Sequence, residues 1–328
     1  MTYKKLLAFS IFIIFTLLLS VQQSCQKENL ISPNDTTLEF EKLSDYKIYD
    51  GNPIDLIPNN DFQLYEISSQ LFSDYAQKQR LIKLPKNTKL KALNDGLLEF
   101  PEGTIIVKTF FYYNDERNHS LGKKLIETRV LILKEGKWTA GTYYWNDEQT
   151  DAYLTNVGFE KLVNWIDKGG NANVLSYHIP SNLECRACHS TNKETQPIGP
   201  KVRNLNFMVD RDGNEINQLD FLSTKGILYP VDHENFGSTP NYNNDGFSIE
   251  QRARAYLDIN CAHCHRSQGS AHEIRYRFEY ETDFHSTKIK EGKNAIKQMV
   301  ENGYMPKIGT TVIDKEGIEL INQYLKAL

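Results

Sequence analysis

The 328-residue chain has few cysteines and methionines, five and four respectively, and no excess of basic residues. Its formal net charge of -4 leaves no surplus positive charge to neutralise phosphates, which argues against nucleic acid as a partner. No segment after the first 25 residues is apolar enough to cross a bilayer. What the chain does have is an apolar N-terminal run and a distinctive spacing of its cysteines.

The N-terminus has the features of a secretory signal peptide. Lys4 and Lys5 precede an apolar run over residues 6–21, and the small residue Ser24 follows it. This run is shorter than the ~20 residues that a membrane-spanning helix needs. We therefore expect residues 1–24 to be removed on export.

Cys25 directly follows this segment, and its position resembles that of the lipid-accepting cysteine of bacterial lipoproteins. Gln22 departs from the leucine that such signals usually carry, so a plain signal peptide and an uncleaved anchor remain alternatives. The polar residues 25–45 predict a lipidated tether. These features predict a membrane-anchored lipoprotein in the periplasm or elsewhere in the cell envelope.

Residues 46–178 carry mainly strand signals. The runs 104–113, 125–134 and 137–146 are rich in β-branched and aromatic residues, and Glu135-Gly136 between the last two is a hairpin signal. Hairpin links rather than intervening helices predict an antiparallel, β-rich, sandwich-like domain. The remaining elements expected here are short strands at 81–84 and 174–178 and helices at 69–79 and 159–168.

Helix signals dominate residues 179–328. Ser248 with Gln251 three residues later forms a capping box for a helix that runs to Asn260. Another helix is expected over 214–225, and a final one after a cap at Asp314. The prediction for the whole chain is an α+β fold in which a β-rich domain precedes a mostly α-helical region.

The four cysteines other than Cys25 form two Cys-x-x-Cys pairs, each followed at once by histidine. The residues are Cys185, Cys188 and His189 in the first motif, and Cys261, Cys264 and His265 in the second. Cys-x-x-Cys-His is the attachment signal of c-type haem, in which two thioethers hold the porphyrin and the histidine binds the iron. The motifs predict two covalent haems c, and residues 179–328 become a di-haem, cytochrome c-like region.

Other roles of four cysteines account less well for the spacing of the two motifs and for the histidine after each pair. The separation of Cys188 from Cys261 far exceeds the ~15–20 residues usual between the halves of a zinc ribbon. A redox dithiol of the thioredoxin kind requires a βαβ setting, which this region lacks. Disulfides are plausible in an exported chain but leave the histidine after each pair unexplained.

The sixth ligand of each iron decides what the haem does. Met305, in the segment Gly303-Tyr-Met-Pro306 after the second motif, is the candidate for the second haem, because thioether sulfur opposite histidine favours electron transfer. For the first haem the candidates are Met208, His178 and His233, and an open position is the alternative. Four arginines close in sequence to the motifs are candidates to pair with haem propionates: Arg203, Arg252, Arg254 and Arg266.

The chain resembles a bacterial family of exported di-haem c-type cytochromes that has no settled substrate. The matching stretches run from about residue 60 to the C-terminus: 71–76 with Lys78 and Arg80, 127–129, 144–146, 179–181, 196–206, 217–219 and 255–257. The resemblance implies haem binding and electron transfer in an exported protein.

We therefore expect a relay of single electrons rather than an enzyme, with an unknown redox protein as partner. One alternative is a di-haem peroxidase-like enzyme with an open position at the first haem. The other is a haem-bearing module that binds a partner protein or a carbohydrate through its β-rich domain.

Overall fold

The computed structural model describes residues 38–328. The predicted signal peptide 1–24 and the predicted lipid site Cys25 lie outside the described residues, as does the predicted tether up to residue 37. The last part of that tether is described, and there Leu38 and Leu43 are buried against the sheet. Within the described residues, no helix has the length and hydropathy needed to cross a membrane.

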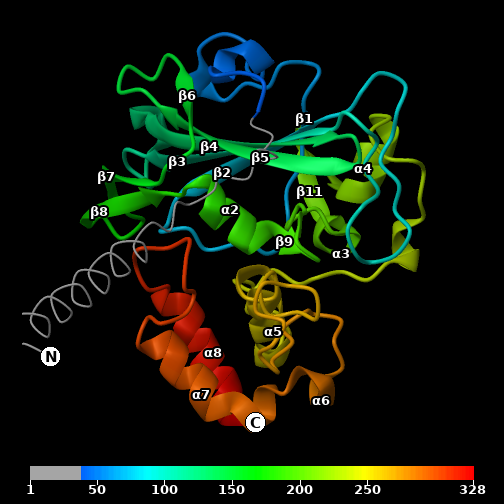
Figure 1. Ribbon diagram of the computed structural model, residues 1–328, viewed down its shortest axis with the longest axis vertical. Helices are drawn as coiled ribbons and strands as arrows, with labels where there is room; N and C mark the ends of the chain where they lie inside the picture. Colours follow the sequence, from blue (N-terminus) through cyan, green and yellow to red (C-terminus); the bar gives the residue numbers. More distant parts are fainter. Residues whose placement is uncertain (1–37) are drawn as a thin grey trace, which may run out of the picture. The chain divides into compact units, whose positions relative to one another are not determined.

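A six-stranded antiparallel sheet forms the centre of the fold (Figure 1). Its strands follow one another in chain order, each hydrogen-bonded to the next, as β1 (Gln63–Leu64), β2 (Gln77–Lys83), β3 (Ile105–Tyr113), β4 (Lys123–Lys134), β5 (Lys137–Trp145) and β6 (Ala152–Thr155). The β4–β5 hairpin is confirmed, since Glu135 and Gly136 both adopt positive φ, 54° and 72°, as a tight two-residue turn requires. The predicted strands at 104–113, 125–134 and 137–146 are confirmed as well.

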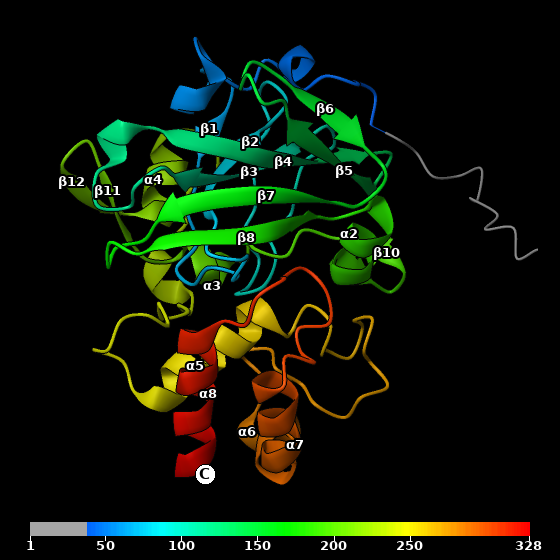
Figure 2. The ribbon, with the colours of Figure 1, turned by 90° about the vertical axis from the view of Figure 1, so that its left-hand side faces the viewer.

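A second, two-stranded antiparallel sheet lies against the central sheet (Figure 2). It consists of β7 (Phe159–Ile166) and β8 (Ala172–Ile179). Trp165 and Tyr177 from this sheet share a buried cluster with Phe110 and Tyr112 of β3. The helix predicted at 159–168 is therefore wrong, because burial at Val163 and Trp165, two residues apart, follows the period of a strand.

The helix predicted at 69–79 is also wrong. This segment is a loop that turns at Asp74 and Tyr75, whose φ angles of 52° and 65° are left-handed, before it enters β2. Left-handed backbone at two consecutive residues cannot continue an α-helix. The turn instead brings Phe72 and Ser73 to the edge of the cavity described below.

After β8 the chain alternates short helices with small hairpins and loops. The helices are α2 (Asn182–His189), α3 (Val202–Leu205), α4 (Gln218–Thr224), α5 (Ile249–Asn260), α6 (Phe284–Thr287), α7 (Ile289–Glu301) and α8 (Lys315–Ala327). The hairpins pair β9 (Ser190–Thr191) with β10 (Glu194–Thr195), and β11 (Met208–Arg211) with β12 (Asn214–Asn217). Four 3-10 turns complete the fold: η1 (Leu43–Tyr46), η2 (Pro53–Asp55), η3 (His119–Leu121) and η4 (His233–Asn235).

The predicted fold class is wrong for the second half of the chain. Residues 179–328 do not form a mostly α-helical, cytochrome c-like region, because helices occupy less than half of them and the six-stranded sheet dominates the fold. The helix predicted over 214–225 shows why: its first residues pair as β12 with β11, and only Gln218–Thr224 is helical. The caps at Ser248 and Asp314 are confirmed, at the starts of α5 and α8.

The two halves of the chain share a hydrophobic core. One cluster joins Ile82, Ile106 and Leu131 of the central sheet to Leu205 of α3 and Ile259 of α5. A separate cluster holds α5, α7 and α8 together below the sheet (Figure 1). As a result, α2, which carries the first cysteine motif, lies between the sheet and this helical cluster, and the second motif follows directly after α5.

Candidate cofactor site

One cavity is bounded by the sheet, α2, the end of α5 and the loop before α8. Its volume is about 220 Å³, many times the ~10–15 Å³ that one water molecule requires. It therefore has room for a group of many atoms rather than for a bare ion. Five predicted site residues line this cavity: Cys185, Cys188, His189, Cys261 and Met305.

The first motif lies on α2, and local hydrogen bonds fix where this helix begins. Ser181 caps it in a capping box with Glu184, whose carboxylate accepts from Ser181 N at 2.8 Å. Glu184 also bonds His178 Nε2 at 2.9 Å, which ties the start of α2 to the end of β8. Cys185, buried in the first turn, lies 3.6 Å from Thr142 Oγ1 of β5.

His189, the last residue of α2, has the hydrogen-bond pattern of a metal ligand. Its Nδ1 lies 2.7 Å from the carbonyl oxygen of Gln196, so the neutral ring donates there and keeps Nε2 as the atom free to ligate. Burial is the main cause that lowers the pKa of His189, to about 4, and the ring is therefore neutral at pH 7. A neutral imidazole with one fixed nitrogen suits haem iron.

The second motif begins where α5 ends. Cys261 N still donates to Leu257 O at 2.9 Å, and His265 N donates to Cys261 O at 2.9 Å, so the motif forms one further turn. His265 is not part of the cavity wall; its ring packs 5.3 Å from the ring of Phe278. Its Nδ1 is buried and lacks a hydrogen-bond partner.

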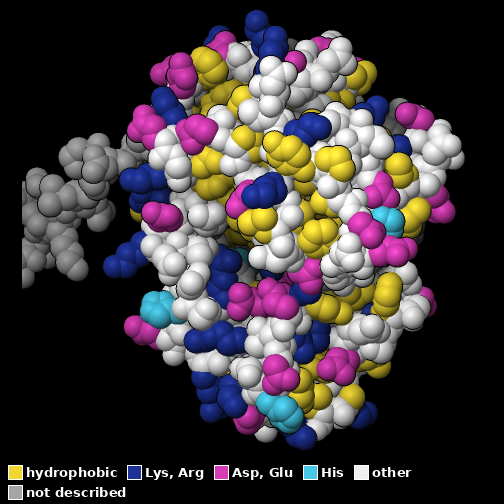
Figure 3. Space-filling view, turned by 90° about the vertical axis from the view of Figure 1, so that its right-hand side faces the viewer, with side chains coloured by type: hydrophobic (Ala, Val, Ile, Leu, Met, Phe, Trp, Pro, Cys, Tyr) yellow, Lys and Arg dark blue, Asp and Glu magenta, His cyan; other side chains and the backbone are white. Residues whose placement is uncertain are grey.

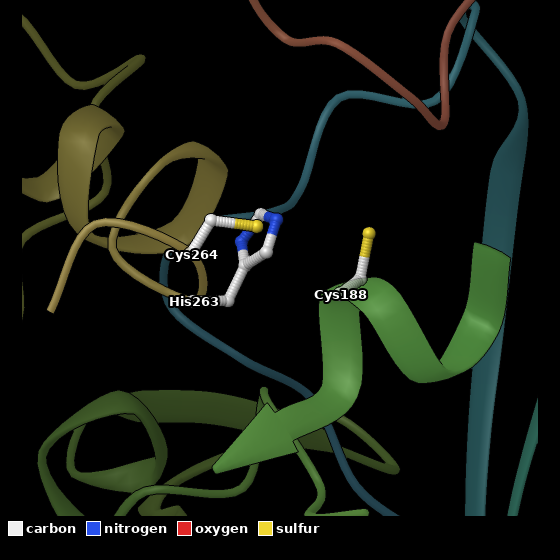
Figure 4. Close-up of side chains that lie close together, drawn as sticks. All are labelled: Cys188, His263 and Cys264. Carbon is white, nitrogen blue, oxygen red and sulfur yellow. The ribbon is translucent and has the colours of Figure 1, made fainter. Parts of the chain in front are cut away.

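The two motifs lie side by side in the fold, although they are far apart in the sequence. Ligand atoms of Cys188, His263 and Cys264 all lie within 4.8 Å of one another. Figure 4 shows the side chains of His263 and Cys264, beyond α5, on the opposite side of a gap from Cys188 on α2. The two Cys-x-x-Cys-His motifs are thus immediate neighbours.

Two thiols and one imidazole could also hold a zinc ion. Structural zinc sites, however, almost always have four protein ligands, and this cluster offers three among residues 38–328. A zinc ion there would leave Cys185, His189, Cys261 and His265 without a role. The residues present fit two c-type haems better, because each motif then uses both thiols and its histidine.

Met305 is partly buried and packs beside the helical cluster to which Cys261 also belongs. It lies in the loop before α8 and lines the same cavity as both motifs. Its backbone N–H donates to Met299 O at 3.1 Å, which holds the loop against the end of α7. This position is compatible with the predicted role as distal ligand.

None of the three residues considered as distal ligand of the first haem lines the cavity. Met208 is 55 % exposed on β11. Burial tends to lower the pKa of His178, but hydrogen bonds to Glu184 and to Glu160, at 2.7 Å, outweigh it and raise this pKa, so both ring nitrogens are engaged. His233 pairs with Asp220 at 2.8 Å.

The four arginines predicted near the haems are occupied elsewhere. Arg203 pairs with Asp95 and Glu281, and Arg254 donates to backbone carbonyls of residues 279–282. Arg252 donates to Tyr242 O at 2.9 Å, and Arg266 donates to Thr191 Oγ1. None of them lines the cavity.

Three cations to which the sequence assigned no role in the site do line it: Arg80, Lys108 and Arg129. They lie directly opposite one another on β2, β3 and β4, and we call them the cation row. A sequence signal existed only for Lys108, which interrupts the mainly apolar and aromatic strand β3, since β2 and β4 contain other polar residues as well.

Charge on the surface gives no competing site on the face drawn in Figure 3, where positive and negative side chains are interspersed. Comparisons of the chain with protein-family models, with curated proteins and with solved structures find no match. The features of the chain that indicate a function are therefore the two motifs and the cavity where they meet.

Proposed function

We propose that this chain is an exported c-type cytochrome that binds two haems covalently and relays single electrons at the cell envelope. The observation that supports it best is the convergence of both Cys-x-x-Cys-His motifs on one cavity. Two neighbouring redox centres are what a relay needs, because electron transfer between cofactors requires them to be close. When bound, the haems would supply reversible one-electron chemistry at iron.

The chain's own residues have distinct tasks in this proposal. In each motif the two thiols would hold the porphyrin through thioether bonds to its two former vinyl groups. His189 would ligate through Nε2 while Gln196 O holds its Nδ1–H. Met305 and His265 would bind the iron of the second haem, and the apolar walls from Ile67, Ile106 and Leu131 would keep water out of the cavity.

The N-terminal segment belongs to the same proposal. Cys25 would carry the lipid and anchor the protein to the membrane, and residues 1–24 would direct export. Export supports covalent attachment, because a loosely bound cofactor would be lost outside the cell. The redox partner would be another envelope protein.

One observation favours a second candidate, a peroxidase-like enzyme. Met208, His178 and His233 all lie outside the cavity wall, so none of them is placed to close the first haem. An open position on the first iron would admit a small ligand such as a peroxide.

The test is the haem content of variants made in a host that matures c-type cytochromes. The wild type should carry two haems per chain by pyridine haemochrome assay. The pair Cys185→Ala and Cys188→Ala should leave one, as should the pair Cys261→Ala and Cys264→Ala. Cys25→Ala is the control and should keep both haems while it releases the protein from the membrane.

The same samples separate the rival functions. Two low-spin haems support the relay, whereas a high-spin haem that persists without Cys261 and Cys264 supports the enzyme. A colourless wild type with one zinc ion per chain would overturn both and leave the thiol cluster as a metal site.

A further inference from the structure

The cation row is an unusual feature of the central sheet. Arg80 of β2 lies opposite Lys108 of β3, and Lys108 lies opposite Arg129 of β4, so three like charges occupy adjacent positions on one sheet face. Like charges directly opposite each other destabilise a sheet. Something other than sheet stability must explain them.

The row is also short of negative partners. Arg129 pairs with the buried Glu127 at 2.6 Å, and Tyr177 donates to the same carboxylate at 2.6 Å. Arg80 is only 5 % exposed, and its Nη2 is buried without a hydrogen-bond partner. Among residues 38–328, no ion pair or hydrogen bond engages the Lys108 ammonium group.

The surroundings of Lys108 and Arg129 are aromatic rather than anionic. Both cations lie over the ring of Phe110, at 4.6 and 4.5 Å from its centroid. Such contacts contribute less than the desolvation of a charge costs. Burial accordingly lowers the pKa of Lys108 well below its usual value.

The carboxylates that line the cavity are committed elsewhere. Glu184 is held by Ser181 and His178 at the start of α2. Asp314 accepts from Tyr256 Oη at 2.9 Å and from Gly317 N at 3.0 Å at the start of α8. The cavity therefore presents two basic groups, on Arg80 and Lys108, that have no ion-pair partner among residues 38–328.

The row lies beside the first motif rather than the second. Thr142, the β5 residue opposite Arg129, contacts Cys185 Sγ. Lys108, Arg129 and His189 all line the cavity. A dianion that enters next to Cys185 and His189 would meet the row.

We propose that Arg80 and Lys108, supported by Arg129, bind the two carboxylates of the haem attached at Cys185 and Cys188. This inference rests on the proposed function and deepens it, because it assigns a carboxylate-binding site to that haem. Arginine and lysine are the side chains that bind carboxylates with charge-assisted hydrogen bonds. Two basic side chains without an ion-pair partner would then bind the two carboxylates of one haem.

The assignment predicts a change in reduction potential. Positive charge near the iron disfavours its oxidised form, so removal of a cation should lower the potential of the neighbouring haem. Lys108→Met and Arg80→Gln should each shift the one-electron equilibrium by about tenfold, which corresponds to about 59 mV. Arg80→Lys keeps the positive charge, so this variant should retain most of the wild-type reduction potential.

The experiment is a spectroelectrochemical titration of the full-length di-haem protein. Lys161→Met is the matched control, because Lys161 of β7 is another partly buried strand lysine but does not line the cavity. The protein with Cys185→Ala and Cys188→Ala should lack the first haem, so its titration identifies the reduction potential of the second haem. The reduction potential that falls in Lys108→Met and in Arg80→Gln should be the other one, that of the first haem.

The possible outcomes distinguish failure of the proposed carboxylate site from failure of the proposed function. Two haems with potentials that Lys108→Met and Arg80→Gln move no more than Lys161→Met would overturn the carboxylate site alone. A shift confined to the second haem would also overturn it. A wild type without haem would overturn the proposed function together with the inference.

Discussion

At His189 one ring nitrogen is committed to a backbone carbonyl and the other is left for a ligand. The bond from Nδ1 to Gln196 O fixes both the tautomer and the direction of the ring. Gln196 lies directly after β10, whose pairing with β9 folds the chain back onto the end of α2. A short hairpin thus orients the histidine of the first motif.

Met305 is the residue whose role is simplest to test. If its thioether binds the second iron, Met305→Ala should abolish the near-infrared sulfur-to-iron absorption band and lower the potential of that haem. The measurement is the absorption spectrum of the oxidised protein. Met208→Ala is the matched control and should leave the spectrum unchanged, since Met208 is exposed on β11.

Persistence of the band in Met305→Ala would show that a different methionine is the ligand. Loss of the band in Met208→Ala instead would assign that role to Met208, which the cavity wall does not include. Absence of the band from the wild type would remove methionine from both haems.

At the scale of elements, the helices below the sheet hold the second motif in place. α8 packs on α5 where Gly317 faces the ring of Tyr256, and a Cβ at that position would overlap the ring. Tyr256 in turn donates to Asp314, the cap of α8. The close approach of these two helices places the end of α5 beside the loop that carries Met305.

Gly317→Ala should therefore destabilise the protein. Alanine normally stabilises a helix by ~1 kcal/mol relative to glycine, so a net loss would isolate the effect of the clash. We expect the free energy of unfolding to fall by about 1 kcal/mol or more, measured by urea denaturation. Lys326→Ala, at an exposed position of the same helix, should change it little, and equal stability of Gly317→Ala and wild type would contradict the packing described.

Elements with strong local signals could be predicted from sequence. The β4–β5 hairpin has its turn residues at Glu135-Gly136, and α5 has its capping box at Ser248. Residues 159–166 could not be assigned in this way, because their strand pairing depends on β8 and on burial against β3. Tertiary contacts, rather than local sequence signals, determine that residues 159–166 form a strand.

The candidate site, too, could be predicted from the sequence only in part. The two motifs were visible in the sequence because their chemistry depends on residues that are adjacent. Their meeting at Cys188 and Cys264 was not, because it depends on how α2 and the end of α5 pack. The cation row was missed for a related reason, since its three members come together only through the register of β2, β3 and β4.

At the scale of the whole molecule, we propose that a predicted export signal, the cation row of the central sheet and the two neighbouring motifs serve one function. The N-terminal signal would deliver the chain to a compartment where haem is attached covalently. The sheet and the helical cluster would then enclose the cofactors between them. A single claim underlies this picture, namely that the four thiols at 185, 188, 261 and 264 are bonded to porphyrin.

The most direct test of that claim is the mass of the intact mature protein from a host with working cytochrome maturation. The account predicts a coloured protein whose mass exceeds that of the lipidated chain by two haems, with each double-cysteine variant lighter by one. A colourless protein at the mass of the chain alone, or with its cysteines joined as disulfides, would contradict it.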